Sequence, residues 1–398
     1  MSGIRHAPRV LVAIVLLTAC QPVTRAPSAP PTGTPPASLS SPEQSAPSLA
    51  ASAAPVERGS LVRIGSMSTM RAAHTATLLP EGRILIAGGC TEHSCEGITA
   101  TTELLDPSTG SSTPGPDMSE PRVGHTAATL PDGRILLIGG FGERDVTPTT
   151  DVFDPATNTI APGLELSVPR ADAVTLVLED GSVLVAGGYD GGESLASAEI
   201  LAPGATAFAP AGSMATPRSR NTGVLLDHGR VLVLGGSGPD EGDLLASAEI
   251  FDPAIGTWSR AGDMTVRRHK LAAVTLDDGR VLVLGGSDER DGFGRYRSTE
   301  LYDPAARTFT AASDMAAPRY KHTFAVVRLV DGRVLVAGGA PTAELFDPAT
   351  GAFETVPGGA NADQSFSTAV VLPDGSVVVA GGYDQQVRLT DQVLRFVP

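Results

Sequence analysis

The sequence predicts an all-β protein, a seven-bladed β-propeller of four-stranded antiparallel blades, and three observations support this. A pair of adjacent glycines recurs about every 50 residues, a period typical of propellers and other repeat arrays. Each pair ends a short apolar run, and an alternating segment precedes that run. An Asp-Pro or Ala-Pro dipeptide follows it in repeats 1 to 6. The pairs, from which we number repeats 1 to 7, are Gly88-Gly89, Gly139-Gly140, Gly187-Gly188, Gly235-Gly236, Gly285-Gly286, Gly338-Gly339 and Gly381-Gly382.

Repeat 4 illustrates the first half of a unit. Residues 221–226 alternate weakly and predict a first strand, strand a. The tripeptide 227–229 ends in glycine and predicts a tight turn, because glycine adopts positive φ without steric cost. Residues 230–234 are apolar after the initial Arg230 and include two β-branched valines, which predicts a strand b buried on both faces. The glycine pair after it permits a bend or the close approach of a neighbouring backbone.

The second half of the unit completes an antiparallel meander. Residues 245–251 predict strand c, and residues 257–260 predict strand d with the single tryptophan, Trp258. Asp252-Pro253 between them predicts a turn, since the Asp side chain bonds backbone groups ahead of it and Pro presets φ. The same dipeptide position recurs at Asp106-Pro107, Asp154-Pro155, Ala202-Pro203, Asp303-Pro304 and Asp347-Pro348.

These residues together resemble the kelch repeat. The shared features are an Arg and a His-Thr that open strand a, the double glycine after strand b, and Asp-Pro before an aromatic residue in strand d (Trp258, Phe309 and Phe353). The resemblance extends over residues 59–398. It implies a kelch-type propeller similar to the central domain of galactose oxidase, in which radial closure protects the edges of the sheets.

The two ends of the repeat region predict how the ring closes. Repeat 7 has segments for strands a, b and c (367–372, 376–380 and 389–397) but none for strand d. An unassigned strand-like segment, residues 60–65, precedes strand a of repeat 1. It leads into a Met and an Arg, as other strand d segments do. We therefore expect residues 60–65 to supply the fourth strand of the last blade.

The first 20 residues predict a lipoprotein signal peptide. Arg5 and Arg9 precede an apolar core at residues 10–17, which is too short to span a bilayer. Leu17-Thr18-Ala19-Cys20 resembles the bacterial lipobox, which implies lipidation of Cys20 and attachment to a membrane through that lipid. By analogy with Gram-negative sorting, Gln21 favours the outer membrane, on its periplasmic side or at the cell surface. The alternative is an ordinary secretory signal with an incidental cysteine.

Composition limits the remaining chain. Residues 21–58 are rich in Pro, Ala, Ser and Thr, which predicts a disordered tether, and residues 59–398 predict one propeller domain. The net charge is −15, from 29 basic and 44 acidic residues, and argues against a nucleic-acid partner. We expect a monomeric propeller without a cofactor.

Cys90 and Cys95 lie close together in the loop after strand b of repeat 1. In an oxidising compartment such a pair favours a local disulfide. A metal site formed with His93 is the alternative, although it offers too few ligands for a structural metal.

The loops predict which face binds a ligand. In an antiparallel meander the a–b and c–d turns share one face, and the b–c and d–a loops share the other. The a–b turns are nearly uniform, whereas the b–c loops differ in length and composition, and the loop after Gly339 is almost absent. Variable loops on a constant scaffold usually carry binding residues. We therefore expect a protein or glycan ligand on the b–c/d–a face.

A basic residue opens strand a in six repeats. An arginine that pairs bidentately with carboxylates could hold an acidic ligand there, as in some kelch adaptors. The alternative is internal pairing with strand c acids, since repeat 7 replaces both partners, with Gln364 and Gln392. The arginines are Arg71, Arg122, Arg170, Arg218, Arg268 and Arg319, and the acids are Glu103, Asp151, Glu199, Glu249, Glu300 and Glu344.

Three histidines follow these arginines by three residues: His74, His125 and His322. They are further tentative ligand-binding residues at the channel mouth. A three-histidine metal site is conceivable, but the kelch pattern itself places His here and the repeats are far apart in a ring, so we expect no metal.

Binding is a better expectation than catalysis. The galactose-oxidase resemblance implies copper held by two Tyr and two His, with one Tyr cross-linked to Cys, yet neither Cys90 nor Cys95 is placed beside a plausible Tyr-His pair. No nucleophile elbow, phosphate loop or HExxH motif occurs, and no catalytic residue is assigned. The leading hypothesis is a membrane-anchored binding module at the cell envelope. The alternative is a channel-mouth sugar-processing enzyme resembling an epimerase or mutarotase, with copper-dependent oxidation less favoured.

Overall fold

The computed structural model describes residues 58–95, 97–240, 243–359 and 364–398. The predicted signal peptide, which includes Cys20, and nearly all of the predicted tether lie outside these residues. The described chain is all-β, with four short 3-10 helices: η1 (His93–Cys95), η2 (Asp227–Gly229), η3 (Asp291–Phe293) and η4 (Thr323–Ala325). None of the described residues belongs to a helix with the length and apolar character needed to cross a membrane.

Each repeat contributes one strand of each kind. Strands a are β2 (Thr75–Leu78), β6 (Thr126–Thr129), β10 (Val174–Val177), β14 (Thr222–Leu225), β18 (Ala272–Thr275), β22 (Val326–Arg328) and β26 (Thr368–Val371). Strands b are β3 (Ile84–Ala87), β7 (Ile135–Ile138), β11 (Val183–Ala186), β15 (Val231–Leu234), β19 (Val281–Leu284), β23 (Val334–Val336) and β27 (Val377–Ala380). Strands c are β4 (Thr102–Asp106), β8 (Thr150–Asp154), β12 (Ser197–Leu201), β16 (Ser247–Asp252), β20 (Thr299–Asp303), β24 (Ala343–Asp347) and β28 (Gln392–Phe396). Strands d are β5 (Ser111–Pro114), β9 (Thr159–Pro162), β13 (Ala209–Ser213), β17 (Thr257–Asp263), β21 (Thr308–Ala311) and β25 (Ala352–Val356), and β1 (Leu61–Ser66) precedes them all.

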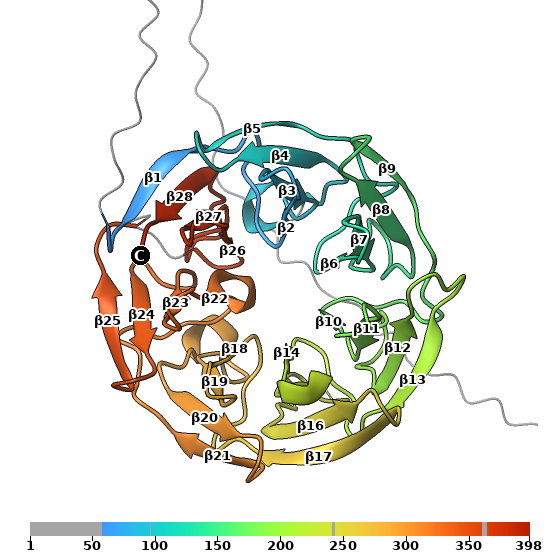
Figure 1. Ribbon diagram of the computed structural model, residues 1–398, viewed down its shortest axis with the longest axis vertical. Helices are drawn as coiled ribbons and strands as arrows, with labels where there is room; N and C mark the ends of the chain where they lie inside the picture. The colour runs from blue at the N-terminus through green and yellow to red at the C-terminus, as the bar shows by residue number, and fades with distance from the viewer. Residues whose placement is uncertain (1–57, 96, 241–242, 360–363) are drawn as a thin grey trace, which may run out of the picture. The chain divides into compact units, whose positions relative to one another are not determined.

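The strands form a propeller of four-stranded antiparallel meanders. Repeats 2 to 6 each form a separate four-stranded sheet in the order a-b-c-d. Strands a lie nearest the centre of the ring and strands d at its rim (Figure 1). The expected burial of strands b on both faces is confirmed, because every residue of these strands is buried.

Repeats 1 and 7 differ from the others because they share one eight-stranded sheet, in the order β2-β3-β4-β5-β1-β28-β27-β26. β1 pairs antiparallel with β28, with Leu61 opposite Phe396 and Ser66 opposite Gln392. The predicted pairing of the two ends of the repeat region is therefore confirmed. The structure differs from seven separate sheets because β1 also meets β5 through one parallel pair, Ser66 with Ser111.

Two glycines make this extra contact possible. A Cβ on Gly65 would lie 2.4 Å from the carbonyl oxygen of Gly110, and a Cβ on Gly110 would lie 2.7 Å from the nitrogen of Gly65. Only backbones without side chains approach this closely. The N-terminal strand is thus held on both of its edges, by β28 and by β5.

The apolar core lies between successive repeats. The last apolar residue of strand c packs against strand b of the preceding repeat. In repeat 1 it is the fully buried Leu105. In five other repeats it is an aromatic residue: Phe153, Phe251, Tyr302, Phe346 or Phe396. Repeat 3 has Leu201 at this position, and that side chain is only partly buried.

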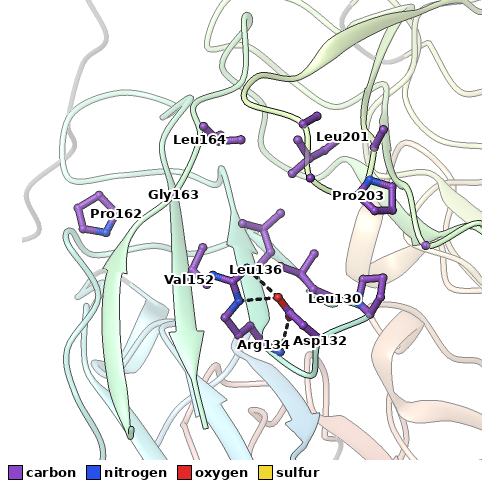
Figure 2. A pocket seen from close by; sticks show the side chains of 15 residues that line it. Leu130, Asp132, Arg134, Leu136, Val152, Pro162, Gly163, Leu164, Leu201 and Pro203 are labelled. Carbon is purple, nitrogen blue, oxygen red and sulfur yellow. Dashed lines mark hydrogen bonds and ion pairs between the residues drawn. The ribbon is translucent and has the colours of Figure 1, made fainter. Parts of the chain in front are cut away.

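A hollow accompanies the smaller side chain of Leu201. It has a volume of about 450 Å³ and is lined mainly by apolar side chains of repeats 2 and 3, among them Leu130, Leu136 and Leu164 (Figure 2). It opens between the a–b turn of repeat 2 and the c–d turn at Pro203, on the face away from the variable loops. We interpret it as a packing defect, because six of the seven repeats fill the equivalent place with a buried side chain.

Removal of residues 59–66 tests the closure of the ring. The deletion exposes the edge of β28 and removes the buried Leu61, so we expect the melting temperature to fall by about 10 °C or more. Thermal unfolding followed by circular dichroism measures this. A chain lacking residues 21–57 but keeping β1 is the control and should melt as the full chain does; an unchanged melt of the 59–66 deletion would refute the closure.

Leu201→Phe tests the packing defect. The larger ring enters the hollow and buries additional apolar surface, so we expect a gain of about 1 kcal/mol in the free energy of unfolding. The matched control is Leu105→Phe, the same change at the filled site of repeat 1, where overpacking should cost about 1–3 kcal/mol. Chemical denaturation of both variants measures the difference, and equal effects would contradict our interpretation.

Candidate functional site

A groove lies over repeat 6 on the face of the b–c and d–a loops. In repeat 6 the chain passes from Gly339 to β24 almost directly, whereas the b–c loops of repeats 5 and 7 are longer. The two longer loops therefore flank an uncovered strip. A cavity of about 280 Å³ occupies it, lined by Gly292, Phe293, Arg295, Tyr320, Lys321, Ser365, Tyr383, Asp384, Gln385 and Val387. We call this cavity the repeat-6 groove.

Internal hydrogen bonds fix the repeat 5 wall of the groove. Asp288 accepts hydrogen bonds from the backbone and the guanidinium of Arg290, and its own N–H donates to the carbonyl of Gly294. A Cβ at Gly294 would overlap the Asp288 carboxylate, so glycine is required there. The resulting compact loop presents Phe293, whose side chain is 96% exposed. Such exposure of a large apolar ring beside a cavity marks a binding surface more than a core element.

The repeat 7 wall is built in the same way. Asp384 accepts hydrogen bonds from the backbone N–H groups of Gln386 and Arg388 and pairs with the Arg388 guanidinium at 2.6 Å. These contacts keep the pKa of Asp384 below its usual value, although burial opposes them. The carboxylate is therefore committed to shaping its loop, while Gln385 beside it is exposed.

The floor of the groove is aromatic and carries one ammonium group. The Lys321 nitrogen lies 4.7 Å from the ring centroid of Tyr320, 5.5 Å from that of Phe366 and 5.8 Å from that of Tyr383. The Arg295 guanidinium lies 5.7 Å from the Tyr320 ring on the other side. These cation–π contacts hold the rings in place. The groove thus combines fixed aromatic faces with polar groups at its margin.

Lys321 also belongs to a ring of residues around the central channel. One residue per repeat, two positions after the basic residue that opens strand a, has a positive φ between 51° and 64°; these residues are Ala73, Gly124, Asp172, Arg220, Lys270, Lys321 and Phe366. Backbone N–H groups of six of them donate to the carbonyl of the preceding member, at 2.6–3.2 Å. These hydrogen bonds link neighbouring repeats and place the seven residues around the channel mouth.

Charge gathers on one side of this mouth. Lys270 and Lys321 both pair with Asp291 of η3, at 2.6 and 3.3 Å. Burial alone would raise the pKa of Asp291, but its contacts with His269 and Lys270 and the charges of Lys270 and Lys321 hold that pKa far below its usual value. Arg220 lies 3.5 Å from Asp172, whose pKa is raised by burial. Three cations and two carboxylates therefore face one another in a chain of net charge −15.

The six arginines that open strand a are buried beneath this surface, with 0–2% of each residue exposed. Each pairs with the strand c acid of its own repeat, with nitrogen–oxygen distances of 2.6–3.0 Å. Arg218, for example, also donates to the carbonyls of Gly235 and Ser247. A ligand-binding role would need an exposed guanidinium, and the structure instead shows the internal pairing that the sequence left as the alternative.

The acids extend this clamp to the loops. Glu249 accepts hydrogen bonds from the backbone N–H groups of Ala215 and Thr216, which precede strand a, in addition to Arg218. Equivalent bonds occur at Glu103, Asp151, Glu199, Glu300 and Glu344. Each pair therefore ties the d–a loop to strands b and c. In repeat 7, Gln364 keeps only a longer bond of 3.4 Å to Gly381.

The three histidines are also buried, with at most 2% exposed. His74 contacts Thr368, and His125 contacts Thr75, each across a boundary between repeats. Their rings lie against the glycine pair of the preceding repeat, and the His322 ring does the same at Gly285. Burial lowers the pKa of each to about 3. The three histidines are therefore uncharged at neutral pH and pack between neighbouring repeats. They do not form a common site.

Cys90 and Cys95 form a disulfide in the structure, with the Cα atoms 5.0 Å apart. His93 between them accepts a hydrogen bond from the Leu389 backbone, which connects this loop to repeat 7. Among the described residues, no three His, Cys, Asp or Glu side chains form a group that could hold a metal ion.

Sequence reasoning identified His125 among the residues that line the channel mouth, but not the ring residues beside it or the aromatic floor of the groove. The ring residue of each repeat lies between the residue that opens strand a, an arginine in six repeats, and the histidine position that follows it. It varies among repeats from alanine to lysine to phenylalanine. This variation within a repeat that is otherwise regular was the only signal in the sequence that could have identified it. The groove depends on loops of repeats 5 and 7, which only the closed ring brings to either side of repeat 6.

Comparison with known proteins agrees with this fold. The kelch motif matches residues 218–265, which is repeat 4. A solved structure described as a novel fungal alcohol oxidase of the AA5 family, in complex with copper, superposes with a TM-score of 0.67 and 18% identity, covering 85% of this chain and 75% of that chain. No curated protein matches the sequence. The chain is therefore a kelch-type propeller.

The described residues do not fit the copper site that the galactose-oxidase resemblance implies. Both described cysteines are bonded to each other, so neither is available for a cross-link to tyrosine. Tyr302 is fully buried against Phe309, at a centroid distance of 4.6 Å. The three histidines before strands a are buried, and none of them lines the groove that contains Tyr320 and Tyr383. The likeness to the oxidase is thus one of fold.

Arg218→Ala separates the structural role from ligand binding. The substitution leaves Glu249 buried without its partner, so we expect a loss of about 3–5 kcal/mol in the free energy of unfolding. The control is Arg220→Ala, which removes a more exposed pair, with 46% of the Arg220 side chain and 27% of the Asp172 side chain exposed, and should cost about 1 kcal/mol. Urea denaturation measures both. Equal small losses would show that the buried pair contributes nothing.

The histidines predict a pH dependence of stability. Their folded-state pKa of about 3 lies below the unfolded value of 6.5, so the unfolded chain binds more protons between these values. Stability is complete above pH 6.5 and falls as the pH is lowered. Each histidine should contribute a loss of up to about 2 kcal/mol by pH 5.

His322→Leu tests how much of this pH-dependent loss of stability comes from one histidine. Leu is the chosen replacement because repeat 5 has the fully buried Leu271 at the same position. Both ring nitrogens of His322 lack hydrogen-bond partners in the structure, so no bond is lost. The variant should lose less stability than the unmodified chain between pH 7 and pH 5, measured by urea denaturation. An identical loss in both chains would contradict the assignment.

Proposed function

We propose that this protein is a carbohydrate-binding propeller and that its ligand lies in the repeat-6 groove. The observation that carries the proposal is the groove itself: Tyr320 and Tyr383 form its floor, the exposed Phe293 stands at its edge, and Arg295 and Gln385 lie at its margin. Sugars present apolar C–H faces and hydroxyl groups together. A site with fixed aromatic rings and a few placed polar groups matches both.

A glycan fits this site better than a protein does. The cavity of about 280 Å³ is local and concave, whereas a stable protein interface buries a broad surface of many residues. The arginines that could have held an acidic peptide are buried. The outer edges of the first and last repeats are also paired through β1, so they offer no strand for peptide addition.

A sugar-processing enzyme is the second candidate, and one observation favours it. Asp172 at the channel mouth has a raised pKa and lies beside Arg220, which is the kind of pair that can exchange a proton with a bound sugar. The groove offers no comparable carboxylate, since Asp384 is committed to its loop. Turnover of a bound sugar would favour this candidate over simple binding.

The setting of the protein is part of the proposal. The lipobox at residues 17–20 supports a lipid on Cys20 and an outer-membrane location, with residues 21–58 as the tether. Incorporation of a labelled fatty acid into the protein would test this, and Cys20→Ser should abolish that incorporation.

We also propose that the eight-stranded sheet counts as two blades, which gives seven, because β1 continues the meander of repeat 7 beyond β28.

A glycan array with the full-length chain in detergent tests the function. We expect selective binding that Tyr320→Ala or Phe293→Ala weakens at least tenfold, since stacking and packing area are lost. The control is Val330→Ala, which trims another strongly exposed apolar side chain, 81% exposed, on the opposite, uniform face. Absence of glycan binding, or capture of an envelope protein that these variants leave unchanged, would overturn the proposal. A mutarotation and sugar-oxidation assay on any bound sugar tests the enzyme.

A further inference from the structure

A second cavity lies at the channel mouth, next to the groove and distinct from it. It has a volume of about 80 Å³ and is lined by residues of all seven repeats, including Asp172, Arg220, Asn221, Lys270 and Lys321. One water needs about 10–15 Å³, so the cavity is large enough for several polar atoms. It is smaller than the pockets that enclose whole drug-sized ligands. Its size suits a small ligand or one end of a larger one.

Asn221 gives the clearest sign that this cavity takes a ligand. The residue is 9% exposed, and neither its amide nitrogen nor its amide oxygen has a hydrogen-bond partner in the structure. A buried amide without partners is costly, so native proteins rarely leave one. The other repeats place Ala173, Leu271 or Ser367 here, or a histidine. The amide is therefore not demanded by the fold and is available to a ligand.

The charges around Asn221 select the ligand's chemistry. Arg220 and Lys270 are its neighbours in the ring, and Lys321 follows. Asp291 balances the two lysines and Asp172 balances Arg220, which leaves one positive charge among these five groups. A bound anion of charge −1 would complete the balance. The cations lie in a concave site whose protein walls have a low dielectric constant, which strengthens their attraction for an anion.

We propose that the channel mouth binds a small hydroxy-carboxylate, the chemical class to which uronic acids belong. The ligand carboxylate accepts hydrogen bonds from the Asn221 amide and from the neighbouring cations. An adjacent ligand hydroxyl donates to the Asn221 oxygen or to Asp172. This combination uses both halves of the amide, whereas an anion without hydroxyl groups would leave the amide oxygen and Asp172 without donors.

The inference goes beyond the proposed function, because its site is the channel mouth and not the groove. Lys321 lines both cavities, so an acidic sugar at the end of a glycan could occupy the two together. Free acid and glycan-borne acid share the same chemistry at the mouth. The experiment below separates them.

Calorimetric titration of the full-length chain with D-glucuronate, D-glucose and inorganic phosphate tests the proposal. Glucuronate should bind more tightly than both other probes. Asn221→Ala, which copies Ala173 of repeat 3, should weaken glucuronate binding at least tenfold. Arg220→Gln is a second variant at an exposed position and should weaken it as well. Circular dichroism of both variants confirms folding.

Phe293→Ala distinguishes this site from the groove, because Phe293 lines the groove but not the channel mouth. It should weaken binding of glycans that need the groove at least tenfold while leaving the affinity for free glucuronate unchanged. Equal binding of glucose and glucuronate, equal binding of phosphate, or glucuronate affinity that neither Asn221→Ala nor Arg220→Gln changes would each overturn the hydroxy-carboxylate assignment. Loss of free glucuronate binding in Phe293→Ala would show that the acid occupies the groove instead.

Discussion

The buried pairing of an arginine with a strand c carboxylate is the interaction on which each repeat depends. A lone buried guanidinium would be costly, and so would a lone buried carboxylate. Here, in six repeats, the arginine also donates to the carbonyl of the first glycine of the pair, and the acid accepts from the d–a loop. One polar cluster thus connects strand b, strand c and the loop that enters the sheet. This cluster fixes the d–a loop. The channel-mouth residue lies two positions after the arginine, so its place depends directly on the buried pair.

Repeat 7 shows what replaces that device. Its glutamines, Gln364 and Gln392, carry no charge, and the bond from Gln364 to Gly381 is 3.4 Å long. In compensation, this repeat receives β1, whose Leu61 is buried in the core between repeats 6 and 7. Leu61 also exchanges backbone hydrogen bonds with the chain at Pro357 and Gly359. Repeat 7, where the ring closes, is therefore held by strand pairing and apolar burial. The other six repeats also have the buried arginine–carboxylate pair.

The sequence was sufficient for whatever depends on the period of one repeat. Strands b, the Asp-Pro turns, the pairing of β1 with β28 and the internal partners of the arginines all follow from patterns within or between units, because each unit must bury the same apolar strand. The groove could not be predicted in this way. It arises where the b–c loop of repeat 6 is missing, and Phe293 and Tyr383 come together only because repeats 5 and 7 stand on either side of that gap. The positive φ of residues such as Lys270 was equally hidden, since nothing in the local sequence demands a left-handed residue there.

The same reasoning explains why a fold shared with a copper-containing oxidase does not bring its chemistry. The clamp and the glycine pair of each repeat constrain residues that the ring needs for assembly, including the buried histidines. The seven positive-φ positions are constrained mainly in their backbone, because the N–H groups of six of them donate to the carbonyl of the preceding member whatever side chain they carry. Side chains there can change without loss of the scaffold, from Ala73 to Asp172 to Lys321. The ligand sites proposed for this chain therefore depend on the ring residues and on the short b–c loop of repeat 6, and both features meet at Lys321.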